Sequence, residues 1–307
     1  MSKYLVVDGG ATKTTASLRD GKNTILANAE GKGTNFQVIG IQLVVDILRE
    51  MLEEIMRASR IEEVDVLLFA LAGIDCEEDQ VFVEKELVKL CKELNLDYKK
   101  LVVENDAFST LLGLTKSKAG VLVISGTGSI AYAHNGKGAS TRAGGWGHRS
   151  GDEGSGYWIG REILRAVYRM EDGRDQETLL RELVFDYLKI NSIDELLKWH
   201  YSDQYSVDKV ADLMPLLSLA VVQNDETAIN IFERTSIELV ALVDSVIHSS
   251  DIVDEVCSIY FNGGTIRNFE QLFINIKQKI ESKYPEKKVK LCLTSPIESI
   301  YRRAKVL

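Results

Sequence analysis

The sequence predicts an α/β protein of two similarly built domains, and three observations lead to this prediction. The chain has 307 residues, enough for two domains that each bury a core of their own. Short apolar runs typical of strands alternate with segments whose apolar residues recur every three to four positions, as they do on helices. The same order of predicted elements begins twice, once at the N-terminus and once near Gly120.

The first half starts with three predicted strands, at residues 4–8, 14–19 and 23–30. They are separated by turns at Gly9-Gly10 and Asp20-Gly21, which predicts an antiparallel meander. The elements that follow are a helix at 41–60, a strand at 64–70, a helix at 77–94 and a strand at 101–104. This alternation predicts that parallel strands, connected through helices, extend the meander.

The second half repeats the plan. Its predicted strands are 121–125, 129–134, 139–143, 258–262 and 288–294, and its predicted helices are 155–168, much of 176–198, 207–248 and 270–283. The repeat places the boundary near Lys116, so that we expect domains at 1–116 and 117–296. The terminal helix, residues 297–307, is expected to pack on the first domain.

Composition excludes several classes of partner. With 46 acidic and 37 basic residues the formal charge is -9, and no long Lys/Arg run is present, which argues against nucleic acid and anionic membranes. One of the most apolar stretches, 66–74, falls far short of the roughly 20 residues that span a bilayer. The N-terminus lacks a secretory signal, and the four cysteines show no CxxC spacing. We therefore expect a cytoplasmic protein with buried, unpaired thiols.

Three glycine-containing segments follow predicted strands and could let the backbone approach a phosphate. They are DGGATKT at 8–14, SGTGS at 125–129 and FNGGT at 261–265. None is a Walker A loop, since GxxxxGK[ST] is absent from the sequence. An ordinary glycine hairpin explains each of the first two taken singly, but the recurrence of such a hairpin in both halves favours phosphate binding.

Asp106 lies just past a predicted strand end, at the expected N-cap of a helix over 107–114. Aspartate is a common N-cap residue, so a structural role alone would account for it. A carboxylate at a strand end, aimed at a site where a phosphoryl group arrives, is also what a base in phosphoryl transfer requires. The sequence leaves both interpretations open at this point.

Residues 144–158, GGWGHRSGDEGSGYW, form the densest cluster of unusual residues, with six glycines in fifteen positions. Such a segment must be a turned loop, and it leads into the helix predicted from Ser155. Asp152 and Glu153 could simply favour the positive helix end. Carboxylates beside two tryptophans, Trp146 and Trp158, also match a sugar site, where a ring face contacts an aromatic plane and hydroxyls meet charged acceptors.

Taken in order, DGGATKT, Asn105-Asp106, SGTGS, the 144–158 loop and FNGGT resemble the N-acetylglucosamine kinase group of the BadF/BadG/BcrA/BcrD ATPase family, within the actin-like ATPase and sugar kinase superfamily. The resemblance covers nearly the whole chain. It implies two ribonuclease-H-like domains with a nucleotide and sugar cleft between them, use of ATP and Mg²⁺, an amino-sugar substrate and a homodimer.

The resemblance also implies roles for individual residues. Asp106 would be the base for the sugar 6-hydroxyl, and Asp8 would hold Mg²⁺ through water. The nucleotide would be bound by Gly10, Thr12, Lys13, Thr14, Gly126, Thr127, Gly263 and Gly264. The sugar would be bound by Asn35, Gly73, Ser129, Gly145, Trp146 and Asp152.

Several functions remain open from the sequence. The acceptor could be N-acetylglucosamine, N-acetylmuramic acid or, as an alternative, glucosamine. A second class is the ATPase activator of 2-hydroxyacyl-CoA-dehydratase-type reductases, but that function needs cysteines on glycine-rich loops, and SGTGS has none. A transcriptional regulator would need a helix-turn-helix and a basic face, and neither is visible.

Overall fold

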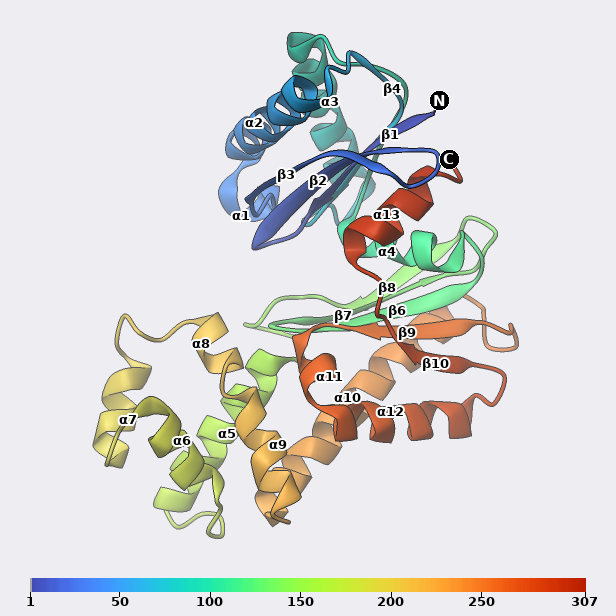
Figure 1. The fold of residues 1–307 in the computed structure, drawn as a ribbon. Coiled ribbons are helices and arrows are strands. Elements are labelled where there is room, and N and C mark those ends of the chain that lie inside the picture. Colours follow the sequence, from blue (N-terminus) through green and yellow to red (C-terminus); the bar gives the residue numbers. More distant parts are fainter. Residues whose placement is uncertain (1) are drawn as a thin grey trace. The chain divides into compact units, whose positions relative to one another are not determined.

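The computed structural model describes residues 2–307, which divide into two compact units. Unit 1 combines the chain up to Lys118 with Thr294–Leu307, and unit 2 is Ala119–Leu293. Each unit contains one five-stranded sheet with helices packed against it (Figure 1).

The strands of unit 1 are β1 (Lys3–Gly9), β2 (Lys13–Asp20), β3 (Ile25–Lys32), β4 (Glu63–Leu71) and β5 (Asp97–Glu104). Its helices are α1 (Phe36–Ile39), α2 (Ile41–Ser59), α3 (Glu77–Leu94), α4 (Asp106–Thr115) and α13 (Pro296–Ala304). The sheet order is β3-β2-β1-β4-β5, in which β1, β2 and β3 pair antiparallel and β1, β4 and β5 pair parallel. The predicted meander with parallel extensions is therefore confirmed.

Both faces of the unit 1 sheet are covered, because its central strands are apolar on each side. Leu5 and Val7 of β1 face the core formed with α2 and α3. Val6, between them, faces the opposite core, which includes Ile300 and Tyr301 of α13. This alternation is the period-two pattern of a strand buried on both faces.

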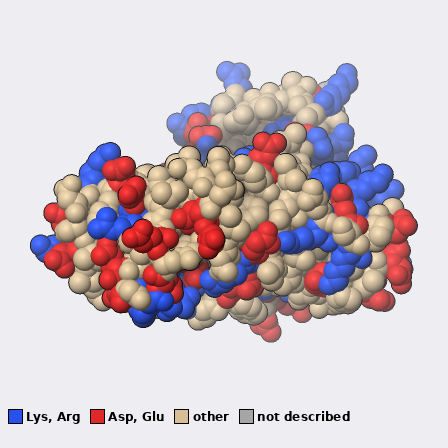
Figure 2. All heavy atoms as spheres, turned by 90° about the horizontal axis from the view of Figure 1, so that it is seen from below, with Lys and Arg blue, Asp and Glu red and all other residues tan. Residues whose placement is uncertain are grey.

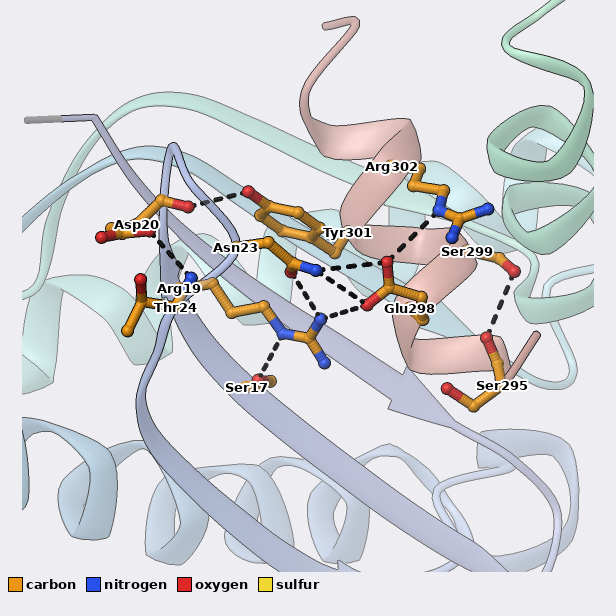
Figure 3. A network of polar contacts seen from close by, with 10 residues as sticks. All are labelled: Ser17, Arg19, Asp20, Asn23, Thr24, Ser295, Glu298, Ser299, Tyr301 and Arg302. Atoms are coloured by element: carbon orange, nitrogen blue, oxygen red, sulfur yellow. Dashed lines mark hydrogen bonds and ion pairs between the residues drawn. The ribbon is translucent and has the colours of Figure 1, made fainter.

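Helix α13 joins unit 1 although it follows the whole of unit 2 in sequence (Figure 3). The Tyr301 hydroxyl donates to the Asp20 carbonyl at 2.7 Å, and Arg19 pairs with Glu298 at 2.5 Å. On its other side, a β-carbon on Gly113 of α4 would lie 1.8 Å from the Ser299 carbonyl oxygen. Only glycine therefore permits the close approach of α4 and α13.

The strands of unit 2 are β6 (Gly120–Ser125), β7 (Ser129–His134), β8 (Ser140–Gly144), β9 (Ser258–Asn262) and β10 (Lys288–Leu291). The sheet order is β10-β9-β6-β7-β8, again an antiparallel meander extended by two parallel strands. Strands β6, β7, β8, β9 and β10 thus correspond to β1, β2, β3, β4 and β5 of unit 1. The predicted repeat of one topology is confirmed.

The helices of unit 2 are α5 (Gly156–Glu171), α6 (Leu180–Leu188), α7 (Ile193–His200), α8 (Val207–Ala211), α9 (Met214–Val222), α10 (Glu226–Ser249), α11 (Gly264–Asn268) and α12 (Glu270–Lys283). The range 207–248 is helical as predicted, and three separate helices occupy it. Pro215 lies in the first turn of α9, and Asp225 caps α10 by accepting from the Ala228 amide at 2.8 Å. Both residues are helix-start signals that the apolar spacing alone does not reveal.

All four cysteines are free, and Cys91, Cys257 and Cys292 are buried as expected. The expectation is wrong for Cys76, which is exposed at the N-terminus of α3. Within residues 2–307, no helix combines the length and apolarity needed to cross a membrane. Figure 2 shows a face on which Lys and Arg side chains are intermingled with Asp and Glu, so this face presents no extended field of one sign.

Candidate active site

The loop between β1 and β2 is held in a tight, defined shape. The Gly10 amide donates to the Lys13 carbonyl, and the Thr34 amide donates to the Gly10 carbonyl, both at 3.0 Å. A β-carbon on Gly33 would lie 2.0 Å from the Ala11 carbonyl oxygen, so the segment after β3 packs directly on the loop. The loop is thereby fixed from both ends, as a phosphate-binding loop must be if it is to be preorganised.

The polar side chains of this loop differ in what they can contact. Thr12 is exposed and available to a ligand. Lys13 is exposed and pairs with Glu30 at 2.7 Å. Thr14 is fully buried, and its hydroxyl donates to the Lys32 carbonyl at 2.7 Å, so this side chain stabilises the loop from beneath.

Asp106 occupies the first turn of α4, directly after β5. The prediction that it caps this helix is wrong, because the N-cap is Asn105, whose side chain accepts from the Ala107 and Phe108 amides at 3.0 and 3.1 Å. Asn105 was a visible signal, as asparagine is a favoured N-cap residue. With the capping role taken by Asn105, the Asp106 carboxylate is left for another function.

Asp8 and Asp106 form a pair of carboxylates with raised pKa values. Burial, reinforced by the negative charge of Asp106, raises the pKa of Asp8 to about 7. Burial also raises the pKa of Asp106 to about 6, against the opposing effect of helix-start amides and with a further increase from the charge of Asp75. A bound cation would stabilise the ionised form of both neighbouring carboxyl groups, which is otherwise disfavoured here.

These residues fit Mg²⁺ in the manner this ion usually adopts. Within residues 2–307 there is no group of three or more His, Cys, Asp or Glu side chains able to cage a metal ion. Mg²⁺ commonly keeps several waters and uses one or two carboxylates together with substrate phosphates. Asp8, at the end of β1 beside the glycine loop, is suited to that arrangement.

Asn35 and Gly73 lie together at the same end of the unit 1 sheet. Asn35 caps α1 by accepting from the Gln37 amide at 3.1 Å, and Gln37 donates to the Gly73 carbonyl at 2.8 Å. Gly73 has φ +89°, and a β-carbon there would lie 2.4 Å from the Asn35 side-chain oxygen. The Asn105 amide group also donates to the Ile74 carbonyl at 3.2 Å, which connects this turn to the start of α4.

In unit 2, the SGTGS loop and the double glycine after β9 come together. The backbone of Gly263 has φ +104°, and a β-carbon there would lie 2.1 Å from the Ser125 carbonyl oxygen. The Gly126 carbonyl accepts from the Gly156 amide at 2.7 Å and from the Thr265 hydroxyl at 3.1 Å. The start of α5 therefore lies against this loop, and the positive end of a helix favours an anion such as phosphate.

Thr127, at the tip of the loop, is exposed, and its hydroxyl lies 3.4 Å from an Asp208 carboxylate oxygen. Asp208 belongs to α8, which sequence reasoning did not connect with the loop. Nothing in the local sequence around 208 signals this proximity, because it arises only when α8 packs on α5.

Asp152 and Ser129 are brought together in unit 2. The buried Asp152 has φ +62°, which is strained for a residue other than glycine. Its carboxylate accepts from the Ser129 amide at 3.4 Å, and burial raises its pKa despite that contact. The Ser129 hydroxyl donates to the Glu153 carbonyl at 2.7 Å, so Ser129 supports the loop that carries Asp152.

The two tryptophans of the 144–158 loop have different environments. Trp146 is 69% exposed, and the Arg142 guanidinium carbon lies 4.6 Å from its ring centroid. Trp158 is buried in the core of unit 2, so Trp146 is the exposed aromatic ring of this loop. Gly145, at φ +71°, lets the backbone turn against Ile130 and presents Trp146.

The structure thus assembles two clusters of predicted site residues, one within each unit. In unit 1 the tertiary contacts unite Asp8, Asp106, Asn35, Gly73 and the β1–β2 loop. In unit 2 they unite Gly126, Thr127, Gly263, Gly264, Ser129 and Asp152. Sequence reasoning assigned no role to Asp75 or Asp208, and it named Asn105 and Thr265 only as parts of motifs. Among these residues, only Asn105 carries a local signal, because asparagine is a favoured N-cap residue.

Comparison with known proteins identifies the family. A family model described as the BadF/BadG/BcrA/BcrD ATPase family matches residues 5–301. An N-acetylmuramic acid/N-acetylglucosamine kinase of Clostridium acetobutylicum is 30% identical over 291 residues, covering 94% of this chain and 93% of the relative. An N-acetyl-D-glucosamine kinase of Dictyostelium discoideum is 30% identical over 303 residues, covering 94% of each chain.

The fold also matches a solved structure. A protein of Chromobacterium violaceum assigned to the N-acetylglucosamine kinases superposes with a TM-score of 0.74 at 21% identity, covering 99% of both chains. Together with the repeated sheet topology, this match confirms the predicted fold class, the α/β fold of actin-like ATPases built from two ribonuclease-H-like halves.

Proposed function

Because the chain belongs to the BadF/BadG/BcrA/BcrD ATPase family, we propose that it is a kinase that transfers the γ-phosphoryl group of ATP to the 6-hydroxyl of an N-acetylated amino sugar. The substrates proposed are N-acetylglucosamine and N-acetylmuramic acid, which the names of the two relatives specify. The observation that carries the proposal is the pair Asp8 and Asp106, two partly buried carboxylates with raised pKa values beside a glycine loop.

Asp106 is proposed as the general base. Its pKa of about 6 leaves the carboxylate mostly ionised at neutral pH, yet basic enough to accept the proton of the sugar hydroxyl as the phosphoryl group arrives. Its position at the start of α4 is fixed by the Asn105 cap and by the link from Asn105 to Ile74. A base held in this way loses little freedom when the substrate binds.

Nucleotide-binding groups are proposed in both units. Asp8 would hold Mg²⁺, which neutralises charge on the phosphates when it is bound. Gly10, Thr12 and Lys13 would contact phosphate on unit 1, with Thr14 shaping the loop from beneath. On unit 2, Gly126 and Thr127 would contact phosphate, and Gly263 and Gly264 would adjoin the adenosine. Phosphoryl transfer depends mainly on such positioning and charge stabilisation.

The sugar is proposed to contact Asn35, Gly73, Gly145, Trp146 and Asp152, with Ser129 supporting the loop of Asp152. Asp152 resembles a hydroxyl-binding carboxylate, since it is buried, strained and only weakly hydrogen-bonded. An exposed aromatic plane such as Trp146 can cover the apolar face of a sugar ring.

The redox activator is the competing member of this family. That function needs cysteine thiolates on exposed glycine-rich loops. Here Cys91, Cys257 and Cys292 are buried, and Cys76 begins α3. This placement favours the kinase. A homodimer and a cytoplasmic location remain predictions, to be checked by sedimentation and by fractionation.

The test is a coupled ADP-release assay with Mg-ATP and a panel of sugars: N-acetylglucosamine, N-acetylmuramic acid, N-acetylmannosamine, glucosamine and glucose. We expect turnover of at least one of the first two, and loss of that turnover when Mg²⁺ is chelated. The matched variants are Asp106→Asn and Asp46→Asn, the latter on the exposed face of α2. If no sugar is turned over and Asp106→Asn keeps the basal ATPase rate, the kinase proposal is refuted.

A further inference from the structure

A second pocket of distinct chemistry lies within unit 2, alongside α5. Its volume is about 340 Å³, and four of its eight lining residues are arginines. Arg161, Arg165 and Arg169 follow one another at four-residue spacing on α5, so they lie on one face of the helix. Arg174 comes from the loop that follows. We call this the arginine pocket.

The carboxylates around the arginine pocket do not balance its arginines. Buried Glu162 is shared by three guanidinium groups, those of Arg161 at 3.9 Å, Arg165 at 3.3 Å and Arg234 at 2.8 Å. Asp175 pairs with Arg169, and Asp172 pairs with Arg174. The four lining arginines thus share three carboxylates, one of which also pairs with Arg234, and none of the three lines the pocket itself.

Two buried polar atoms in the lining residues lack a partner. The Tyr168 hydroxyl and His200 Nδ1 are inaccessible to solvent and form no hydrogen bond within residues 2–307. Their rings pack edge to face with centroids 6.0 Å apart, and the His200 ring lies 4.8 Å from that of Tyr205. Buried polar groups are almost always hydrogen-bonded, so these two atoms are unusual features of the aromatic side of the pocket.

An adjacent pocket, by contrast, is lined by equal numbers of arginines and carboxylates. It has a volume of about 590 Å³ on the neighbouring side of α5 and shares Arg165 and Arg169. Its three arginines are matched by three lining carboxylates, those of Glu162, Asp175 and Glu226. It therefore has no surplus charge with which to attract an anion, whereas the arginine pocket has one.

We propose that the arginine pocket binds a small phosphorylated metabolite, with guanidinium groups around the phosphate and the rings of Tyr168, His200 and Tyr205 against the rest of the ligand. Arginine forks match phosphate oxygens and form charge-assisted hydrogen bonds. A phosphate monoester also carries close to two negative charges, which a lining of four arginines without a carboxylate can attract. Aromatic rings beside them suit a ligand that has a sugar ring or a base.

This site is separate from the phosphate loop of the proposed kinase. The Gly156 amide at the start of α5 bonds to Gly126 of that loop, and Arg165 lies nine residues further along the helix, about 14 Å at 1.5 Å per residue. The inference therefore goes beyond the proposed function and does not depend on it.

The experiment is isothermal titration calorimetry of the full chain with three probes: inorganic phosphate, a hexose 6-phosphate and uridine 5′-monophosphate. The pocket variant is Arg161→Gln with Arg174→Gln, two exposed side chains that line only this pocket. The matched control removes two arginines elsewhere, by Arg57→Gln and Arg181→Gln. Thermal melts of both variants establish that they are folded.

We expect at least one probe to bind the wild type and the control variant equally, and the pocket variant roughly tenfold or more weakly, as the loss of charge-assisted hydrogen bonds implies. Preference among the probes distinguishes free phosphate, sugar phosphate and nucleotide as the source. Equal binding by the pocket variant, or no binding of any probe, overturns the proposal. A change of oligomeric state in the pocket variant alone also overturns it, because the arginines would then contact a second copy of the chain.

Discussion

Replacing Asp106 with asparagine should abolish activity and, at the same time, stabilise the folded chain. The substitution keeps the shape of the side chain but removes its charge and its ability to accept a proton. Loss of a general base typically lowers turnover by about 10²–10⁴-fold. The opposite effect on stability follows from the raised pKa of the wild-type carboxyl.

The size of the expected gain in stability follows from the shift in the pKa of Asp106. The pKa of Asp106 rises from 3.8 to about 6, and each pKa unit corresponds to about 1.4 kcal/mol. Keeping this carboxylate ionised in the folded state therefore costs at most about 3 kcal/mol above pH 6. Because the side chain is partly exposed, solvent screening lowers the expected gain in the variant to about 1–3 kcal/mol.

The sign of the pH dependence is fixed by the direction of the shift. Well below pH 3.8, the ordinary pKa of this group, the carboxyl is protonated in both folded and unfolded chains, so Asp106→Asn and wild type should be equally stable. As the pH rises from about 4 to 6, the unfolded chain loses its proton first, and wild-type stability falls relative to the variant. The difference should be fully developed at pH 8.

The assay is urea unfolding at pH 4 and pH 8, without Mg²⁺ or nucleotide, beside the kinase assay on the same preparations. Asp46→Asn, at an exposed position of α2, should change neither stability nor turnover. A variant that loses activity without any gain at pH 8, or that gains equally at pH 4, would refute the assignment of Asp106 as a carboxylate destabilised by burial.

Two further predictions concern backbone and packing. Gly263→Ala should destabilise unit 2 by more than Gly138→Ala. Both glycines have φ above +100°, but only at Gly263 would the new β-carbon lie within 2.1 Å of another residue. Urea unfolding of the two variants measures the difference, and equal losses of stability would contradict the close approach. Tyr301→Phe should lower the free energy of unfolding of unit 1 by about 1 kcal/mol through loss of the 2.7 Å hydrogen bond to Asp20, whereas Tyr201→Phe at an exposed site should have no effect.

Much of the fold could be predicted from the sequence, because the elements leave local signals. The strand runs, the paired turns and the second start near Gly120 predict a meander followed by parallel strands in each half, and only the structure gives the strand order within each sheet. Apolar spacing does not locate the helix ends. Pro215 and the Asp225 cap divide the helical range predicted over 207–248 into separate helices.

The candidate site was predicted less completely, since a side chain's role depends on its neighbours. Sequence could not separate Asn105 from Asp106 as the cap, although this choice decides whether the Asp106 carboxylate stays available. It also treated Trp146 and Trp158 alike, whereas one is exposed and the other lies in the core. Burial of this kind depends on the packing of distant elements.

The sequence by itself determined the repeated α/β topology, the glycine segments and the acidic residues at strand ends, because these follow from periodicity and from the backbone freedom of glycine. Only the tertiary structure decided which of these segments meet: Gly263 against Ser125, Gly73 against Asn35, and α13 against β2. The raised pKa values of Asp8 and Asp106 and the arginine pocket likewise follow only from the tertiary structure. Desolvation and charge balance are set by groups that lie far apart in the chain, and local sequence does not record them.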